Sequence, residues 1–200
     1  MHIPELFSAI QSLPPVMHLE IGGERYQKTF RHTFSAGIDA QQVTAELLGN
    51  LCVPLAIVEK QCQPLYQFAN GMRLFHSETD KDDSGKYFIP SLTFYPLEQL
   101  ASKTAYMQSQ VFQATHRGED SPIYSEGLVV GEAMGTGNPL VLVRWGALAG
   151  KLAYADQDPD DGNWQDKPFA QSLADLLTQI ALPPYAGLCN LCGAEKIWFE

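Results

Sequence analysis

Residues 127–156 read GLVVGEAMGTGNPLVLVRWGALAGKLAYAD and contain three short apolar runs separated by glycine-containing turns. The runs cover residues 127–132, 140–145 and 151–156 and are rich in Val, Leu, Trp and Tyr, which favour strands. Consecutive strands with short connections pair antiparallel, so we expect three neighbouring antiparallel strands here. The turn at residues 135–138 (GTGN) has too few glycines for a dinucleotide fingerprint and lacks the lysine of a P-loop.

Helical patterns lie on both sides of these strands. Residues 169–180 place Leu173, Leu176, Leu177 and Ile180 on one face, as in an amphipathic helix packed on a core. Upstream, a helix is predicted from Pro54 to about Phe68, with one buried stripe and Asn70-Gly71 as its stop. The stripe consists of Leu55, Val58, Cys62, Leu65 and Ala69. Asp39 is the expected N-cap of an earlier helix, and Pro96 is expected to open another after a strand at 91–95.

The chain begins with a short amphipathic helix and a hairpin. Pro14-Pro15 ends the helix, and Gly22-Gly23 joins two strand-like runs, because glycines readily adopt the positive φ angles of a tight turn. The whole order predicts an α+β fold, mainly an antiparallel sheet flanked by helices, with an N-terminal hairpin extension. We divide the chain into an extension at 1–37, a main domain at 38–182 and a C-terminal tail at 183–200.

The 200-residue chain is acidic, with 13 Lys and Arg against 23 Asp and Glu and a formal net charge of −10. Such a charge disfavours nucleic acid and anionic membranes as partners, and it attracts basic proteins. The start lacks the pattern of a secretory signal, and no run approaches the roughly 18 apolar residues of a membrane helix. We therefore expect a cytoplasmic protein.

The acidic residues concentrate after the last predicted strand. Asp156, Asp158, Asp160 and Asp161, with Trp164 nearby, form a candidate contact surface for a basic partner, to which we add Glu132. The run does not match the calcium-binding loop of an EF-hand. A loop that begins at Asp156 has Asp161 at its sixth position and Lys167 at its twelfth, where the motif requires Gly and Glu. Trp145 and Tyr154 are further candidate anchors, but their strand positions favour ordinary packing.

Two cysteines near the C-terminus are the candidate metal ligands. Cys189 and Cys192 have the spacing of half a zinc knuckle, but the sequence offers no second half beside them. Cys52 and Cys62 fall in predicted helices, and we expect both to be buried, reduced thiols. We favour packing of the tail over a metal role and expect no cofactor. The sequence also contains neither GxSxG nor HExxH, so no catalytic residue is assigned.

Five segments, in this order, resemble the SUKH superfamily, the group of bacterial toxin-immunity proteins and fungal cell-wall regulators. They are residues 64–71 (PLYQFANG), 92–100 (LTFYPLEQL), 127–142 (GLVVGEAMGTGNPLVL), 150–158 (GKLAYADQD) and 169–177 (FAQSLADLL). Each segment is weak alone, and their succession carries the resemblance.

The resemblance implies a non-catalytic protein-binding domain. It suggests an immunity protein that neutralises a toxin, for example a basic nuclease, by binding it through an acidic surface. Two alternatives stay open: a regulatory or scaffold protein of the same fold with a non-toxin partner, and a metal-dependent protein that uses Cys189 and Cys192.

Overall fold

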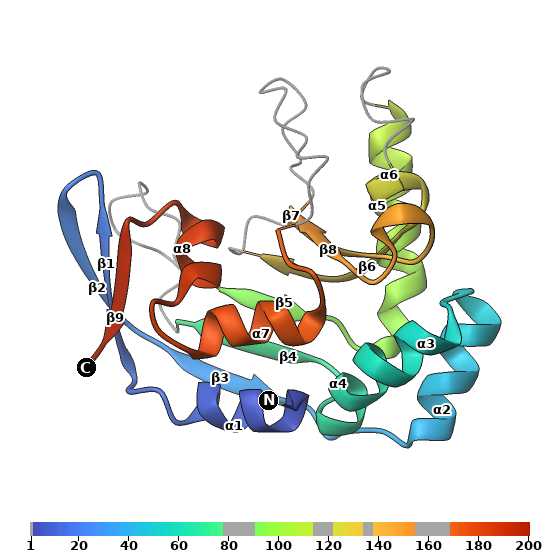
Figure 1. The fold of residues 1–200 in the computed structure, drawn as a ribbon, viewed down its shortest axis with the longest axis horizontal. Helices are drawn as coiled ribbons and strands as arrows, with labels where there is room; N and C mark the ends of the chain where they lie inside the picture. Colours follow the sequence, from blue (N-terminus) through green and yellow to red (C-terminus); the bar gives the residue numbers. More distant parts are fainter. Residues whose placement is uncertain (1, 78–90, 114–121, 134–137, 155–168) are drawn as a thin grey trace.

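The structure is a computed structural model, and it describes residues 2–77, 91–113, 122–133, 138–154 and 169–200. Within these ranges the strands form two antiparallel sheets, one of six strands and one of three (Figure 1). Helices pack on the larger sheet, as the sequence predicts for an α+β fold. None of the described helices is both long enough and apolar enough to cross a membrane.

The larger sheet places its strands side by side in chain order, from β3 to β8. Its strands are β3 (Arg31–Phe34), β4 (Met72–His76), β5 (Leu92–Phe94), β6 (Gly127–Ala133), β7 (Asn138–Val143) and β8 (Leu152–Tyr154). Every neighbouring pair is antiparallel. The three strands predicted between residues 127 and 156 are therefore confirmed as β6, β7 and β8.

The smaller sheet has the order β2-β1-β9 and joins the two ends of the chain. Its strands are β1 (Val16–Ile21), β2 (Glu24–Thr29) and β9 (Lys196–Phe199). The predicted hairpin is confirmed, since Gly22 and Gly23 have φ angles of 61° and 78°. The C-terminal segment forms α8 (Ala186–Cys192) and then β9, which pairs with β1.

The remaining helices include the predicted ones and a short helix, α6, that the sequence analysis did not predict. The α-helices are α1 (Ile3–Gln11), α2 (Ala40–Ala45), α3 (Leu55–Ile57), α4 (Gln63–Phe68), α5 (Leu100–Gln113), α6 (Pro122–Ser125) and α7 (Leu173–Ala181). Two π-helical turns, η1 (Glu46–Asn50) and η2 (Val58–Cys62), and two 3₁₀ turns, η3 (Leu97–Gln99) and η4 (Gly146–Leu148), complete them.

Capping residues explain where two of these helices begin. Asp39 accepts a hydrogen bond from the Gln41 N–H at 2.7 Å, which confirms it as the N-cap of α2. The last helix begins at Leu173 rather than at the predicted Phe169, because the Ser172 hydroxyl caps it by accepting from the Asp175 N–H at 3.0 Å.

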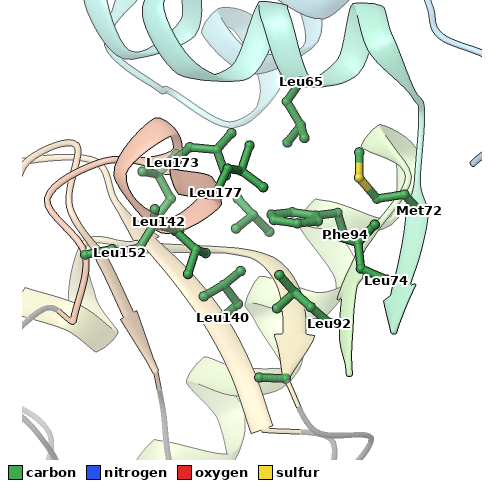
Figure 2. Packing of buried hydrophobic residues seen from close by; sticks show 14 of the residues in the cluster. Leu65, Met72, Leu74, Leu92, Phe94, Leu140, Leu142, Leu152, Leu173 and Leu177 are labelled. Atoms are coloured by element: carbon green, nitrogen blue, oxygen red, sulfur yellow. The ribbon is translucent and has the colours of Figure 1, made fainter. Parts of the chain in front are cut away.

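The core lies between the larger sheet and a layer formed by α1, α4 and α7. Figure 2 shows Leu173 and Leu177 of α7 and Leu65 of α4 directed towards Phe94, Leu140 and the other labelled residues of the sheet. The four residues predicted to face inward from the last helix are all buried. Leu55 departs from the predicted stripe, since 50% of it is exposed.

The opposite face of the sheet is covered only in part. Val141 and Val143 alternate with the inward residues of β7, and both are fully buried on this second face, where α5 and α6 contact β6 and β7. A hydrogen bond of 3.0 Å from the Val129 N–H to Thr104 Oγ1 fixes α5 against β6. Towards β3, β4 and β5 the same face carries the polar side chains of Thr33, Arg73 and Thr93, and it is open as far as the described residues go.

Candidate binding groove

The open part of this second face forms a groove of about 420 Å³. It lies over β3 to β6 and is bounded by the segment that leads from β5 into η3. Its lining consists of Thr33, Phe34, Ser35, Gly71, Met72, Arg73, Thr93, Phe94, Tyr95, Pro96, Gln99 and Glu132. A hollow of this size holds a few side chains of a partner, so we take it as the candidate site.

A row of polar residues crosses the floor of the groove. In the sheet register Thr33 pairs with Arg73, Arg73 with Thr93, and Thr93 with Glu132. Paired residues of antiparallel strands point to the same face, so these four side chains share the groove side. Arg73 and Glu132 lie two strands apart, which corresponds to about 10 Å at the usual strand spacing. The groove thus presents a cationic and an anionic group at separate places.

Glu132 is held in a fixed position by Tyr95. The Tyr95 hydroxyl donates to Glu132 Oε2 at 2.5 Å, and Lys103 Nζ lies 4.4 Å from the centre of the Tyr95 ring. Burial, and then the hydrogen bond to Glu132, raise the pKa of Tyr95 well above its ordinary value. Tyr95 therefore stays a neutral donor at physiological pH, and Glu132 offers its carboxylate to the groove.

The Asn70-Gly71 pair builds the corner beside the groove. The Asn70 side chain accepts from the Leu97 N–H at 2.8 Å and donates to Glu98 Oε2 at 3.1 Å, so it caps the start of η3. Gly71 has a φ of 99°, and its position lies against the Pro96 ring. The predicted helix stop therefore also positions the segment from Pro96 onward at the rim.

Few of the residues predicted from sequence reach this groove. Glu132 lies in it, whereas Asp156, Asp158, Asp160, Asp161 and Trp164 lie outside the described residues. The prediction of ordinary packing is wrong for Trp145, because it follows β7 in an exposed connection and 48% of it is accessible. Tyr154 is partly buried against the core, as predicted.

The groove residues that the sequence analysis missed, Arg73 and Thr93, follow a simple sequence pattern. Arg73 stands between Met72 and Leu74, and Thr93 stands between Leu92 and Phe94. A single polar residue between two apolar ones in a strand lies on the face opposite the core. This alternation marks the second face as open at β4 and β5, although it does not show that the two strands are neighbours.

Cys189 and Cys192 both lie in α8 and are half-buried. The Cys192 thiol donates to the Leu188 carbonyl at 3.2 Å, and burial raises its pKa to about 11. Burial also raises the pKa of Cys189. Among the described residues, no group of three or more His, Cys, Asp or Glu side chains is arranged to hold a metal ion. Both thiols are thus protonated at neutral pH in the structure as described.

Burial is also the main cause of the other resolved pKa shifts. Burial raises the pKa of Tyr66 and that of Cys62, the latter to about 12, and burial followed by the neighbouring His76 lowers that of His32 to about 4. Each shift favours the neutral form of its group. Tyr66, Cys62 and His32 are not among the residues that line the groove.

Comparison with known proteins found no matching family model, no matching curated protein and no matching solved structure.

Proposed function

We propose that this protein is a non-catalytic protein-binding domain and that the groove over β3 to β6 receives an exposed segment of its partner. The observation that carries the proposal is the polar row of Thr33, Arg73, Thr93 and Glu132 on a face of the sheet that the described segments leave open. A sheet fixed by backbone hydrogen bonds loses little freedom on binding, so such a floor is preorganised for a partner.

Within this proposal, the partner is basic and places a Lys or Arg side chain on Glu132. The Tyr95 hydroxyl occupies Oε2 and fixes the carboxylate, so an incoming cation meets an oriented acceptor. The formal net charge of −10 steers a basic protein towards the domain and speeds association. The acidic residues at 156–161 contribute to this net charge.

The resemblance of the sequence to SUKH immunity proteins suggests the biological setting. In that setting the partner is a toxin, for example a basic nuclease, and the domain neutralises it by occupying its substrate cleft. A regulatory or scaffold role with a housekeeping partner uses the same groove and the same charge. The identity of the bound protein distinguishes the two roles.

The experiment is affinity capture from the native cell lysate at low and moderate salt, with mass spectrometry of the bound proteins. The wild type is compared with Glu132→Lys and with the control Glu59→Lys, which makes the same charge change at an exposed position outside the groove lining. We expect a basic protein that is retained by the wild type and by Glu59→Lys, released at higher salt and lost from Glu132→Lys.

Two results would count against the proposal. If Glu132→Lys retained the same partner as the wild type, the groove would not be the binding surface. The second result would be that the wild type captures no protein while a thermal-shift screen finds a stabilising metal ion or small molecule. The protein would then be a metal- or small-molecule-binding protein and not a protein-binding domain.

A further inference from the structure

The two sheets meet at a cluster of aromatic rings that contains a histidine. The His32 ring of β3 lies 5.2 Å from the Phe30 ring and 4.8 Å from the Phe75 ring, measured between ring centres. Phe199 of β9 joins the cluster at 5.6 Å from Phe30 and 6.1 Å from Phe75. Because Phe199 belongs to the smaller sheet and Phe75 to the larger, this cluster connects the two.

The pairing of β3 with β4 is irregular at His32. Arg31 pairs with His76 and Thr33 with Arg73, so two residues of β4 stand opposite His32, as in a β-bulge. Within this bulge Phe75 has a φ of 56°, a left-handed conformation that is costly for a bulky residue. The Phe75 N–H donates to Nδ1 of His32 at 3.2 Å, so the histidine satisfies the backbone group that the bulge turns away from the ladder.

This hydrogen bond fixes the protonation state of the ring. An Nδ1 atom that accepts a hydrogen bond carries no proton, so the neutral ring has its proton on Nε2. His32 Nε2 is buried and makes no hydrogen bond among the described residues. A second proton has to enter at Nδ1, where it points at the Phe75 N–H and breaks the bond.

Among the described residues, few groups around the ring would stabilise its positive charge. His76, 4% exposed, faces it from β4, and Arg31 is its neighbour in β3. The Phe75 ring of β4 and the Phe199 ring of β9 carry no charge. From α1, the Ile10 carbonyl favours the protonated form of His32, but it makes no hydrogen bond to Nε2. Burial, followed by the neighbouring His76, lowers the pKa of His32 to about 4.

We propose that His32 is an acid-sensitive latch, and that its protonation opens the β3–β4 bulge and loosens the junction between the two sheets. Thermodynamic linkage gives the direction in which stability changes with pH. The unfolded chain takes up its proton near pH 6.5 and the folded chain only near pH 4, so stability is complete above pH 6.5 and falls as the pH drops between these values. Over that range the folding equilibrium constant falls by up to about tenfold per pH unit from this one group.

The test compares the wild type with His32→Gln and with the control His18→Gln, which removes a histidine of the smaller sheet. Glutamine keeps an acceptor for the Phe75 N–H and does not titrate. Urea midpoints and hydrogen exchange of the Phe75 amide are measured from pH 7.5 to 4.5. We expect the wild type and His18→Gln to lose exchange protection by at least about tenfold on acidification, and His32→Gln to keep most of it.

The ring can also be followed directly in the wild-type protein, which covers the case in which His32→Gln does not fold. Nitrogen chemical shifts of His32 should report the Nε2–H form at neutral pH and a titration well below pH 6.5. An Nδ1–H form, a titration at the ordinary pH, or a Phe75 amide equally protected at pH 7.5 and 4.5 would overturn the latch. These results do not depend on any partner of the groove.

Discussion

At the level of single residues, the Tyr95 hydroxyl orients the carboxylate of Glu132 in the groove. Glu132 itself is recognisable in the sequence as a polar residue at the end of an apolar strand. Tyr95 and Glu132 are separated by 37 positions, so their contact depends on the pairing of β5 with β6. The fixed acceptor therefore could not be predicted from spacing, whereas the charge that makes it attractive to a basic partner could.

Cys192 allows a direct test of its environment at the same scale. Burial raises its pKa from the ordinary 9.0 to about 11, and only the thiolate reacts with iodoacetamide. At pH 8 we expect its alkylation in the folded protein to be about a hundredfold slower than in urea, with the native rate still rising above pH 10. Mass spectrometry of timed samples measures both rates. Cys52 serves as the internal control, because it is exposed in the connection between η1 and α3, where the prediction of a buried helical position is wrong. Fast labelling of Cys192 would contradict the burial of its thiol and favour the metal interpretation of the Cys189–Cys192 pair.

At the level of elements, periodicity predicts most helices and strands but fails where the helical repeat changes. The predicted helix from Pro54 to Phe68 consists of α3, the π-helical turn η2 and α4. A π turn adds about one residue to a helical repeat, so side chains before it are rotated relative to those after it. This rotation explains why Val58, Cys62 and Leu65 are buried while Leu55 is exposed. A sequence pattern that assumes 3.6 residues per turn throughout cannot detect the change.

Gly131 tests the pairing of the two strands that carry Thr93 and Glu132. A Cβ atom added to Gly131 would lie 2.0 Å from the Thr93 carbonyl oxygen, a backbone atom that cannot move without disturbing β5. We expect Gly131→Ala to lower the free energy of unfolding by about 3 kcal/mol or more, measured by urea denaturation. Gly49→Ala is the matched control, because no atom lies within 4 Å of its added Cβ, and its effect should stay within about 1 kcal/mol. Equal effects of the two substitutions would contradict the close approach of β5 and β6.

At the level of the whole molecule, the two ends of the chain complete one sheet that neither end forms alone. Strand β9 lies on one side of β1 and β2 on the other, so removal of β9 leaves a two-stranded hairpin, which is marginally stable in water. It also removes the Phe199 ring, which contacts the Tyr185 ring at 4.7 Å and the aromatic cluster at the junction. Nothing in residues 196–199 taken alone indicates a strand partner 176 or more positions earlier, because pairing over such a separation depends on the fold.

Deletion of residues 196–200 therefore should act unequally on the two sheets. We expect the backbone amides of β1 and β2 to lose hydrogen-exchange protection by at least about tenfold, while those of β6 and β7 keep it. The core residues labelled in Figure 2, between the larger sheet and α7, all belong to other segments, and the deleted segment adds only Ile197 and the Phe199 ring to the buried cluster. The double substitution Lys196→Ser and Glu200→Ser is the control, since it changes exposed side chains and leaves the backbone pairing intact. Uniform loss of protection in both sheets would mean that the molecule unfolds as one cooperative unit, and that the smaller sheet supports the groove as well as the junction.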